Sequence, residues 1–205
     1  MVKFFGAAAV GIIAYLILNL STFSNDNMVS PCIRVAQNVK AAPSTIWNAC
    51  IGPMNWEQWD EDIVRLEPPK SSKQTSGGTP PQRLELEVGK SFTFIMKDSS
   101  VKEIPVTLLQ VKPNDVIEYK GGAMYGLLKV WGKIEIETEE GEDVAANNTS
   151  TIKYSFELSG MLGSLAMWKD PKPVVHGTET GLANIVRLAE EKQQELSTAK
   201  NTSSS

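Results

Sequence analysis

The stretch that decides the fold is NVKAAPSTIWNACIGPMNWEQW, residues 38–59. An apolar strand pattern ends near its start, and Ala42-Pro43 then opens a short helix. Proline suits the first helical position, because its fixed φ matches the helix and its missing N–H would have no partner there. Gly52-Pro53 ends this helix, and Trp56 and Trp59 follow three residues apart. A second helical turn would place both tryptophans on one face.

Three of the five tryptophans of the chain lie between Trp47 and Trp59. So much aromatic surface, directly after a strand, needs something large to pack against. We therefore expect the stretch to form the short helical side of a deep β-sheet cavity.

Composition limits the classes of function. A chain of 205 residues is expected to hold one domain, with some length left for a tail or an anchor. Its net charge is −4 and no cluster of Lys and Arg stands out, which argues against nucleic acid as a partner. One histidine, His176, and two cysteines, Cys32 and Cys50, are too few for a structural zinc site of the usual kind. We expect no metal and no cofactor.

The two cysteines allow at most one disulfide. Cys50 shares a helical face with Ile46 and Trp47, so it is interpreted as a small buried apolar residue. A Cys32–Cys50 bridge is the alternative, and it would require an oxidising compartment.

Residues 4–23 form a nearly uninterrupted apolar run behind Lys3. Twenty residues at about 1.5 Å each reach about 30 Å, the thickness of the hydrocarbon core of a bilayer. We expect segment 1–24 to be an uncleaved signal anchor, because the apolar core of a cleaved signal peptide is shorter, about 7–15 residues. A cleaved signal peptide remains the alternative.

The charges that flank this run predict the location of the body. Lys3 precedes it and Asn25-Asp26-Asn27 follow it, so the positive-inside rule favours a membrane-anchored protein with its body on the lumenal or extracellular side. Glycosylation sequons at Asn147, Asn148 and Asn201 agree with that side. A secreted protein is the alternative if the segment is cleaved.

The first part of the body combines a strand, the helical stretch and a loop. Val29–Val39 is expected to be a strand, with Ile33 and Val35 on its apolar side. Ile63–Leu66 is a short extended piece, and residues 68–82 contain Pro, Gly, Ser and Lys without an apolar side chain. We expect residues 68–82 to form a flexible inserted loop.

Strands dominate from Arg83 onward. Apolar and polar residues alternate over successive segments with turns between them, which is typical of an antiparallel meander with one buried face. Pro105 suggests a bulge or an edge position in one of these strands. The apolar positions are Leu84, Leu86 and Val88; Phe92, Phe94 and Met96; Ile104, Val106 and Leu108; Val116, Ile117 and Tyr119; Leu128, Val130, Ile134 and Ile136; and Ile152, Tyr154, Phe156 and Leu158.

Helices close the chain. Gly160–Trp168 is apolar and is expected to start a helix, which Pro171 and Pro173 interrupt. A longer helix is expected from about Val174 or Glu179 to Leu196, because Leu182, Ile185, Val186 and Ala189 form an apolar stripe at helical spacing. The main domain is thus expected to span residues 29–197, with a disordered serine-rich tail over residues 198–205.

The order of these elements, with Ala42-Pro43, Trp47 and the pair Trp56 and Trp59, resembles the START-like (SRPBCC) superfamily, and most of all its polyketide cyclase/dehydrase and lipid-transport branch. Leu86-Glu87-Val88-Gly89 stands where that branch enters its central strands. Gly181-Leu182, Leu188 and Glu191 fit its closing helix loosely. The inserted loop, the N-terminal apolar run and the two prolines depart from the pattern, and we expect the prolines to break or kink the closing helix.

The resemblance implies an α+β helix-grip fold, in which a curved antiparallel sheet wraps around a long C-terminal helix and two short helices follow the first strand. An N-terminal hydrophobic helix would precede that fold here. A cavity for an apolar ligand is implied between the sheet and the helix. The candidate ligand-binding residues are Trp56, Trp59, Phe92, Phe94, Met96, Tyr119, Tyr154, Phe156, Met161 and Met167.

The expected function is the binding of a lipid or another hydrophobic small molecule by a monomer, for transport or sensing, near a membrane. The alternative is a cyclase, dehydratase or hydrolase that acts on an apolar substrate in the same cavity. His176 is the candidate catalytic residue for that alternative, because it is the conventional general base of the chain. A membrane-tethered interaction module with a filled core is a third possibility.

Overall fold

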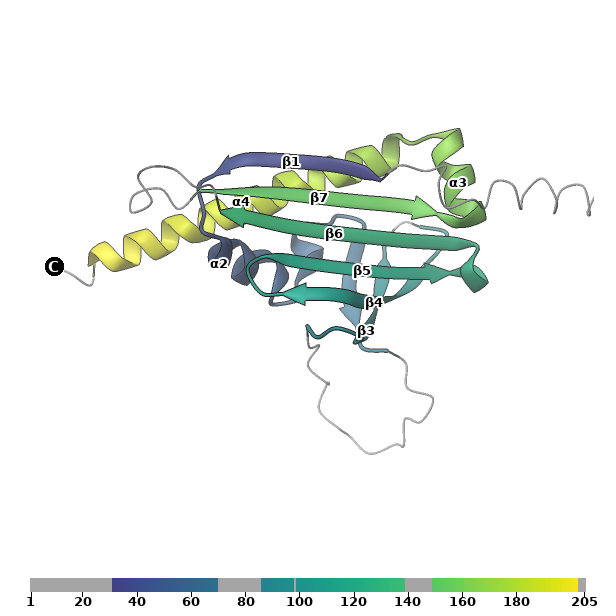
Figure 1. Cartoon of the computed structure of the whole chain (residues 1–205), viewed down its shortest axis with the longest axis horizontal. Helices are drawn as coiled ribbons and strands as arrows, with labels where there is room; N and C mark the ends of the chain where they lie inside the picture. The colour runs from purple at the N-terminus through teal and green to yellow at the C-terminus, as the bar shows by residue number, and fades with distance from the viewer. Residues whose placement is uncertain (1–30, 70–85, 98, 139–148, 203–205) are drawn as a thin grey trace, which may run out of the picture.

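The computed structural model describes residues 31–69, 86–97, 99–138 and 149–202. Seven antiparallel strands form a sheet in the order β1-β7-β6-β5-β4-β3-β2, and a long helix, α4, lies against one face of it (Figure 1). Only the β1–β7 pair joins strands that are far apart in sequence, so the rest is the expected meander. The strands are β1 (Cys32–Val39), β2 (Ile63–Glu67), β3 (Ser91–Met96), β4 (Glu103–Lys112), β5 (Val116–Ala123), β6 (Leu128–Thr138) and β7 (Ser150–Ser159).

Short helices lie at two places along the chain. After β1, α2 (Pro43–Ile46) continues into a π-helical turn, η1 (Trp47–Ile51), in which the N–H of Gly52 donates to the carbonyl oxygen of Trp47 at 2.8 Å. The 3₁₀ turn η2 (Trp56–Gln58) follows it, and η3 (Met124–Gly126) connects β5 to β6. The two short helices predicted after the first strand are therefore confirmed.

The chain ends with α3 (Gly160–Lys169) and α4 (Lys172–Thr202). Helix α4 packs on β1, β7, α2 and η1 and buries Leu182, Ile185 and Ala189 of the predicted stripe. A curved sheet that packs on a long closing helix confirms the predicted α+β helix-grip fold.

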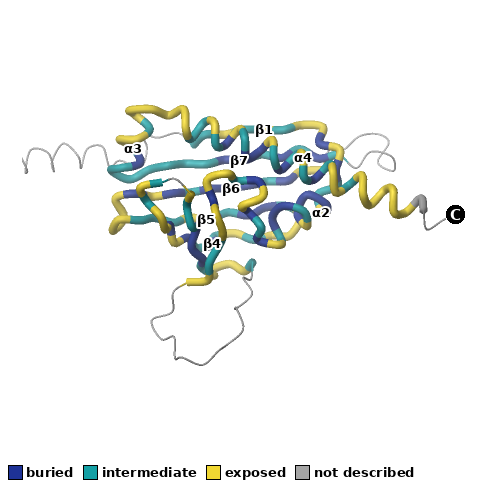
Figure 2. The backbone as a smooth tube through the Cα atoms, turned by 180° about the vertical axis from the view of Figure 1, so that it is seen from behind, coloured by how far each residue is buried: buried dark blue, intermediate teal, exposed yellow. Residues whose placement is uncertain are grey.

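The prolines between the last two helices do not break or kink α4. Pro171 precedes α4 and Pro173 lies in its first turn, where a missing N–H costs no helical hydrogen bond. The helix therefore begins at Lys172, earlier than predicted. It also continues through Thr202, past the start of the predicted tail, and its last turns extend beyond the sheet as an exposed segment (Figure 2).

In strand β1, the side chains predicted to face the interior point to solvent instead. Ile33 and Val35 are 44% and 52% exposed, whereas Arg34 turns toward α4 and pairs with Glu179 at 3.0 Å. A register irregularity between Ala36 and Val39 reverses the alternation, so Val39 is buried. An extra residue in one strand shifts the following side chains to the other face.

Two other predictions about strands are wrong. Leu86–Val88 does not form a strand in the described part of the chain, and Val88 is exposed. Pro105 lies in β4, which is a central strand and not an edge, and the bulge of β4 comes later, between Leu108 and Gln110.

The N-terminal segment 1–24, the sequons at Asn147 and Asn148, and most of the loop 68–82 lie outside the described residues. Among the residues that are described, no helix has both the length and the apolar character needed to cross a bilayer.

Candidate functional site

The tryptophans that follow η1 cap the C-terminal end of that helix. The indole N–H of Trp56 donates to the carbonyl oxygen of Ile51 at 3.3 Å, and that of Trp59 donates to the carbonyl oxygen of Cys50 at 3.0 Å. Carbonyl groups in the last turn of a helix have no partner within the helix, so these bonds satisfy them. Both indoles can therefore be fully buried.

Trp56 is the centre of an aromatic cluster. Its ring centroid lies 5.5 Å from Phe92, 5.7 Å from Phe94 and 5.4 Å from Tyr119, and 5.6 Å from Trp59. Aromatic pairs at such distances contribute about 0.5–1.5 kcal/mol each beyond the area that they bury. This cluster packs η2 against β3 and β5 on the inner side of the sheet.

Another part of the space between sheet and helices is hollow. A cavity of about 720 Å³ lies between the inner face of the sheet, α3, and the first turns of α4. Its size falls within the range of about 300–1,000 Å³ that is typical of ligand pockets, which disagrees with a filled core. Its apolar lining residues are Ile63, Phe94, Met96, Val101, Ile104, Met124, Leu128, Val130, Phe156, Leu158, Leu162, Ala166, Pro173 and Val174.

Two tyrosines line the cavity from neighbouring parts of the sheet. The side chains of Tyr119 and Tyr154 are joined by a hydrogen bond and are 1% and 3% exposed. Burial raises the pKa of both hydroxyls well above the usual value, and the nearby charge of Asp60 raises both further. Both tyrosines are therefore protonated at neutral pH.

Glycines make room for these tyrosines. Gly132 on β6 pairs with Tyr119 across the sheet, and a Cβ at this glycine would lie 2.3 Å from the Tyr119 hydroxyl oxygen. Gly181 on α4 faces the ring of Tyr154, with 3.3 Å between a Cβ built there and the ring. The absence of a side chain at these two glycines leaves room for the rings of Tyr119 and Tyr154.

Acidic residues from the loop after η2 form one part of the lining, together with Gly177 and Thr178 of α4. Asp60 follows Trp59 directly, and its Oδ1 accepts a hydrogen bond from the N–H of Asp62 at 3.1 Å. Burial raises the pKa of Asp60 to about 6, and the charges of Asp62 and Glu61 add to this, while backbone hydrogen bonds oppose it.

The structure places the predicted ligand-binding residues in three groups. Phe94, Met96, Tyr119, Tyr154 and Phe156 line the cavity. Trp56, Trp59 and Phe92 are buried in the packed core and are not among the lining residues. Met161 and Met167 are half-buried on α3 and do not line the cavity, whereas Leu162 and Ala166 of the same helix do.

Sequence reasoning missed the acidic residues and misjudged the histidine. Asp60, Glu61 and Asp62 are not among the residues predicted from the sequence to form the site, yet all three line the cavity. The position of Asp60 directly after a buried Trp-x-x-Trp pair is the signal that could have identified it. His176 is exposed and is not a lining residue, although the next two residues of α4 are.

Both cysteines are free, so the alternative of a Cys32–Cys50 bridge is not realised. Cys50 is buried as predicted; its thiol lies 3.6 Å from the carbonyl oxygen of Ile185, and burial raises its pKa to about 12. Within the described ranges, no group of three or more His, Cys, Asp or Glu side chains is arranged to hold a metal ion.

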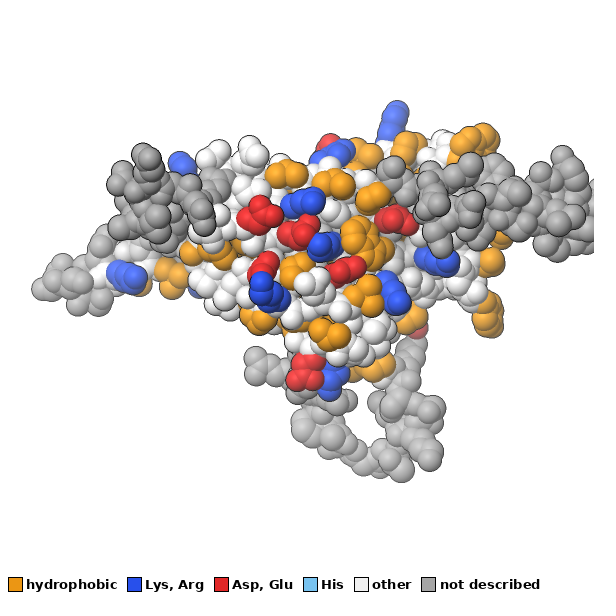
Figure 3. All heavy atoms as spheres, viewed as in Figure 1, with side chains coloured by type: hydrophobic (Ala, Val, Ile, Leu, Met, Phe, Trp, Pro, Cys, Tyr) orange, Lys and Arg blue, Asp and Glu red, His pale blue; other side chains and the backbone are white. Residues whose placement is uncertain are grey.

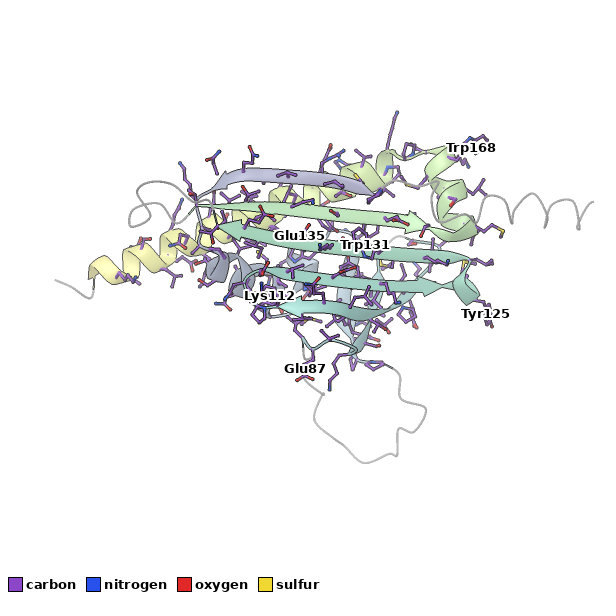
Figure 4. All side chains as sticks on the ribbon, viewed as in Figure 1. Glu87, Lys112, Tyr125, Trp131, Glu135 and Trp168 are labelled. Atoms are coloured by element: carbon purple, nitrogen blue, oxygen red, sulfur yellow. The ribbon has the colours of Figure 1, made fainter. Side chains whose placement is uncertain are left out.

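One end of the molecule carries exposed apolar side chains beside the cavity. Tyr125 in η3 is fully exposed and Trp168 on α3 is 81% exposed, and both lie at the same end and point away from the body (Figure 4). Met124 and Tyr125 have φ angles of 53° and 59°, which side-chain-bearing residues rarely adopt. The N–H of Leu162 donates to the carbonyl oxygen of Leu127 at 2.9 Å and joins α3 to this loop.

The outer face of the sheet has a different character. Acidic and basic side chains alternate on it (Figure 3). Trp131 donates its indole N–H to Glu118 at 2.7 Å, and Lys153 pairs with Glu135 at 3.3 Å, both on this face. Mixed charges of this kind are typical of a solvated surface.

Comparisons with known proteins support the fold. No protein-family model matches the chain, and no curated protein matches it. A hypothetical protein from Helicobacter pylori has a similar structure, with a TM-score of 0.61 and 11% identity over 82% of this chain and 93% of that one. A protein from Arthrobacter aurescens gives a TM-score of 0.52 at 15% identity, over 80% of this chain and 92% of its own. A protein from Nitrosomonas europaea gives a TM-score of 0.51 at 11% identity, over 79% of this chain and 95% of its own. At such identities the likeness concerns the fold alone.

Proposed function

We propose that the protein binds one hydrophobic small molecule or lipid in the cavity and works beside a membrane, to which its N-terminal segment holds it. The observation that carries this proposal is the cavity of about 720 Å³ with a mostly apolar lining. The apolar side chains that line such a pocket are exposed to water when it holds no ligand. A hydrophobic ligand that covers them removes this apolar surface from water, which is favourable.

Several features of the lining suit an adaptable apolar ligand. Met96 and Met124 are unbranched and polarisable, so they adjust to ligands of different shape. Leu162 and Ala166 belong to α3, a short helix that lies between the cavity and the exposed apolar end. A movement of α3 would open the cavity toward that end.

Membrane association is supported by the position of the apolar end. Tyr and Trp side chains are enriched at membrane–water interfaces, and Tyr125 and Trp168 extend from this end (Figure 4). Leu165, on the same helix as Trp168, is 53% exposed. Lys169 is exposed directly after Trp168, where it can meet lipid phosphates. Strand β1, which the N-terminal segment precedes, begins opposite Phe156, near the end of β7 that leads into α3.

A matched pair of α3 variants tests ligand binding. Leu162 lines the cavity, whereas Leu165 on the same helix is 53% exposed and does not. Leu162→Trp should fill part of the cavity and weaken binding of the uncharged fluorophore N-phenyl-1-naphthylamine about tenfold or more. Leu165→Trp should leave the fluorescence titration unchanged. Equal affinity for both variants, or no binding by the wild type, would refute the proposal.

Catalysis in the same cavity is the second candidate function. Asp60, Tyr119 and Tyr154 bring titratable groups with altered pKa values into one pocket, which is common at active sites. An enzyme would lose turnover in Tyr119→Phe and Tyr154→Phe while it retained binding of the fluorophore. Loss of both properties together would indicate a binding protein.

A further inference from the structure

The acidic groups of the cavity come from one short segment of its wall. Asp60, Glu61 and Asp62 come from the loop after η2, and the charge of Asp60 acts on the hydroxyls of Tyr119 and Tyr154. The wall formed by β6, the end of β7 and α3 contributes apolar side chains such as Leu128, Leu158 and Leu162, while Lys97, Ser99 and Ser100 line the cavity where β3 leads into β4. The cavity therefore matches an elongated molecule with one polar end.

The chemistry of this polar part is acidic. Of the described residues that line the cavity, three carry carboxyl groups and Lys97 alone carries a basic group. Lys97 is exposed at the rim, and it forms no ion pair with Asp60 or Asp62 among the described residues. A ligand carboxylate would meet three carboxyl groups there against the single exposed ammonium group of Lys97, which is unfavourable in a partly dehydrated site.

The two tyrosine hydroxyls are an independent sign of a polar ligand group. Both side chains are more than nine-tenths buried, and both line the cavity. Two hydroxyls that share one hydrogen bond still hold one unused O–H donor and several acceptor lone pairs. A group that donates hydrogen bonds to these lone pairs and to the Asp60 carboxylate would satisfy the polar part of the wall.

From this arrangement we infer that the cavity selects an apolar molecule that ends in a positively charged, hydrogen-bond-donating group, such as a long-chain amine, over one that ends in a carboxylate, such as a fatty acid. The inference rests on the proposed function, because it names the ligand class of the same cavity. An ammonium group would donate to Asp60 and to a tyrosine oxygen, and its charge would be balanced by the nearby carboxylates.

The ionisation of Asp60 adds a pH dependence to this selection. Below a pH of about 6, Asp60 is protonated and attracts a cation less, so the preference for the amine should shrink. Helix α3 and the first turns of α4 add no charged residue to the described lining. The titratable or charged groups that face Asp60 from the elements around it are Glu61, Asp62, Lys97, Tyr119 and Tyr154.

A series of ligands that differ only in the terminal group tests the inference. The full chain, in nanodiscs of zwitterionic lipid, is titrated with dodecylamine, dodecanol and dodecanoic acid at neutral pH by calorimetry, with empty nanodiscs as the reference for partitioning. We expect the amine to bind about tenfold or more tighter than the acid, with the alcohol between them. If the acid binds as tightly as the amine, or more tightly, the inference is overturned but the proposed function still stands. Failure of all three ligands to bind would overturn the proposed function as well.

Substitutions test whether the acidic residues of the cavity cause the preference for the amine. Asp60→Asn keeps the shape of the side chain and should remove most of the preference for the amine. Asp62→Asn is a second variant, at an exposed position, and should remove part of the preference for the amine. Glu195→Gln removes the same charge near the far end of α4, where Glu195 is exposed, and should leave the preference unchanged. An amine preference that survives Asp60→Asn and Asp62→Asn would contradict the inference.

Discussion

At the scale of single residues, Gly132 and Asp60 shape the site. Gly132 leaves the space that the Tyr119 ring occupies, and so it fixes where the tyrosine hydroxyls meet. Asp60 holds a carboxyl group against the cavity, where burial makes its ionised form unfavourable. Both residues therefore shape the site at some cost in stability.

Gly132→Ala should destabilise the protein by about 1–3 kcal/mol, because the new methyl group would overlap the Tyr119 ring in a closely packed sheet. The free energy of unfolding in urea measures this loss. Tyr119→Leu removes the ring, so in the double variant the methyl group should cost much less. A cost for Gly132→Ala that is the same in both backgrounds would show that the overlap is not its cause.

Asp60→Asn should make the protein more stable at neutral pH. The raised pKa means that the folded protein binds the proton of Asp60 more tightly than the unfolded chain does, so wild-type stability falls as pH rises from about 4 to about 6. A rise from 3.8 to about 6 corresponds to at most about 3 kcal/mol. The difference in unfolding free energy between variant and wild type should grow by up to this amount between pH 4 and pH 7. A difference that does not change over this range would contradict the assignment.

Period-two alternation was sufficient to place many side chains of the site. Phe94, Met96, Tyr119, Tyr154 and Phe156 alternate along strands with one buried face, and all of them line the cavity. The role of Asp60 could not be predicted in this way. Its place directly after the Trp-x-x-Trp pair is a local signal, but its burial also depends on strands and helices far along the chain.

At the scale of elements, the largest departures from prediction occur where an irregularity changes the facing or the start of an element. The irregularity near Asn38, whose φ is 57°, reverses the facing of β1, and alternation alone cannot reveal an extra residue. Pro173 was expected to kink α4, but a proline is compatible with the first turn of a helix. Whether a proline kinks a helix or lies in its first turn depends on where the helix begins, and the sequence pattern did not fix that point for α4.

Helix α3 and the η3 loop should contact lipid in the intact protein. No tryptophan precedes Trp47 in the sequence, so in full-length protein reconstituted into vesicles, quenching by brominated lipids reports on the body alone. Trp168→Phe should remove most of this quenching, because Trp168 is 81% exposed at the apolar end. Trp131→Phe, on the charged outer face of the sheet, is the control and should change it little (Figure 4). Quenching that persists in Trp168→Phe would place this end away from the bilayer.

At the scale of the whole molecule, the sheet and the closing helix enclose two different parts. Aromatic rings around Trp56 fill one part, and the other part is a cavity that Phe94 and Tyr119 of the same cluster also line. The sequence predicted the fold because each element carries its own pattern and the order of elements is distinctive. The boundary between filled and hollow space depends on how Trp56, Trp59 and Phe92 pack together, so they were predicted to line the cavity and are found in the core.

The central claim is that the cavity holds a molecule in the living cell. Native mass spectrometry of the full chain, isolated from its source in a mild detergent, is the decisive measurement. We expect an added mass of one small molecule per chain, retained in Leu165→Trp and lost in Leu162→Trp. A wild-type chain that carries no added mass, or an added mass that persists in Leu162→Trp, would contradict it.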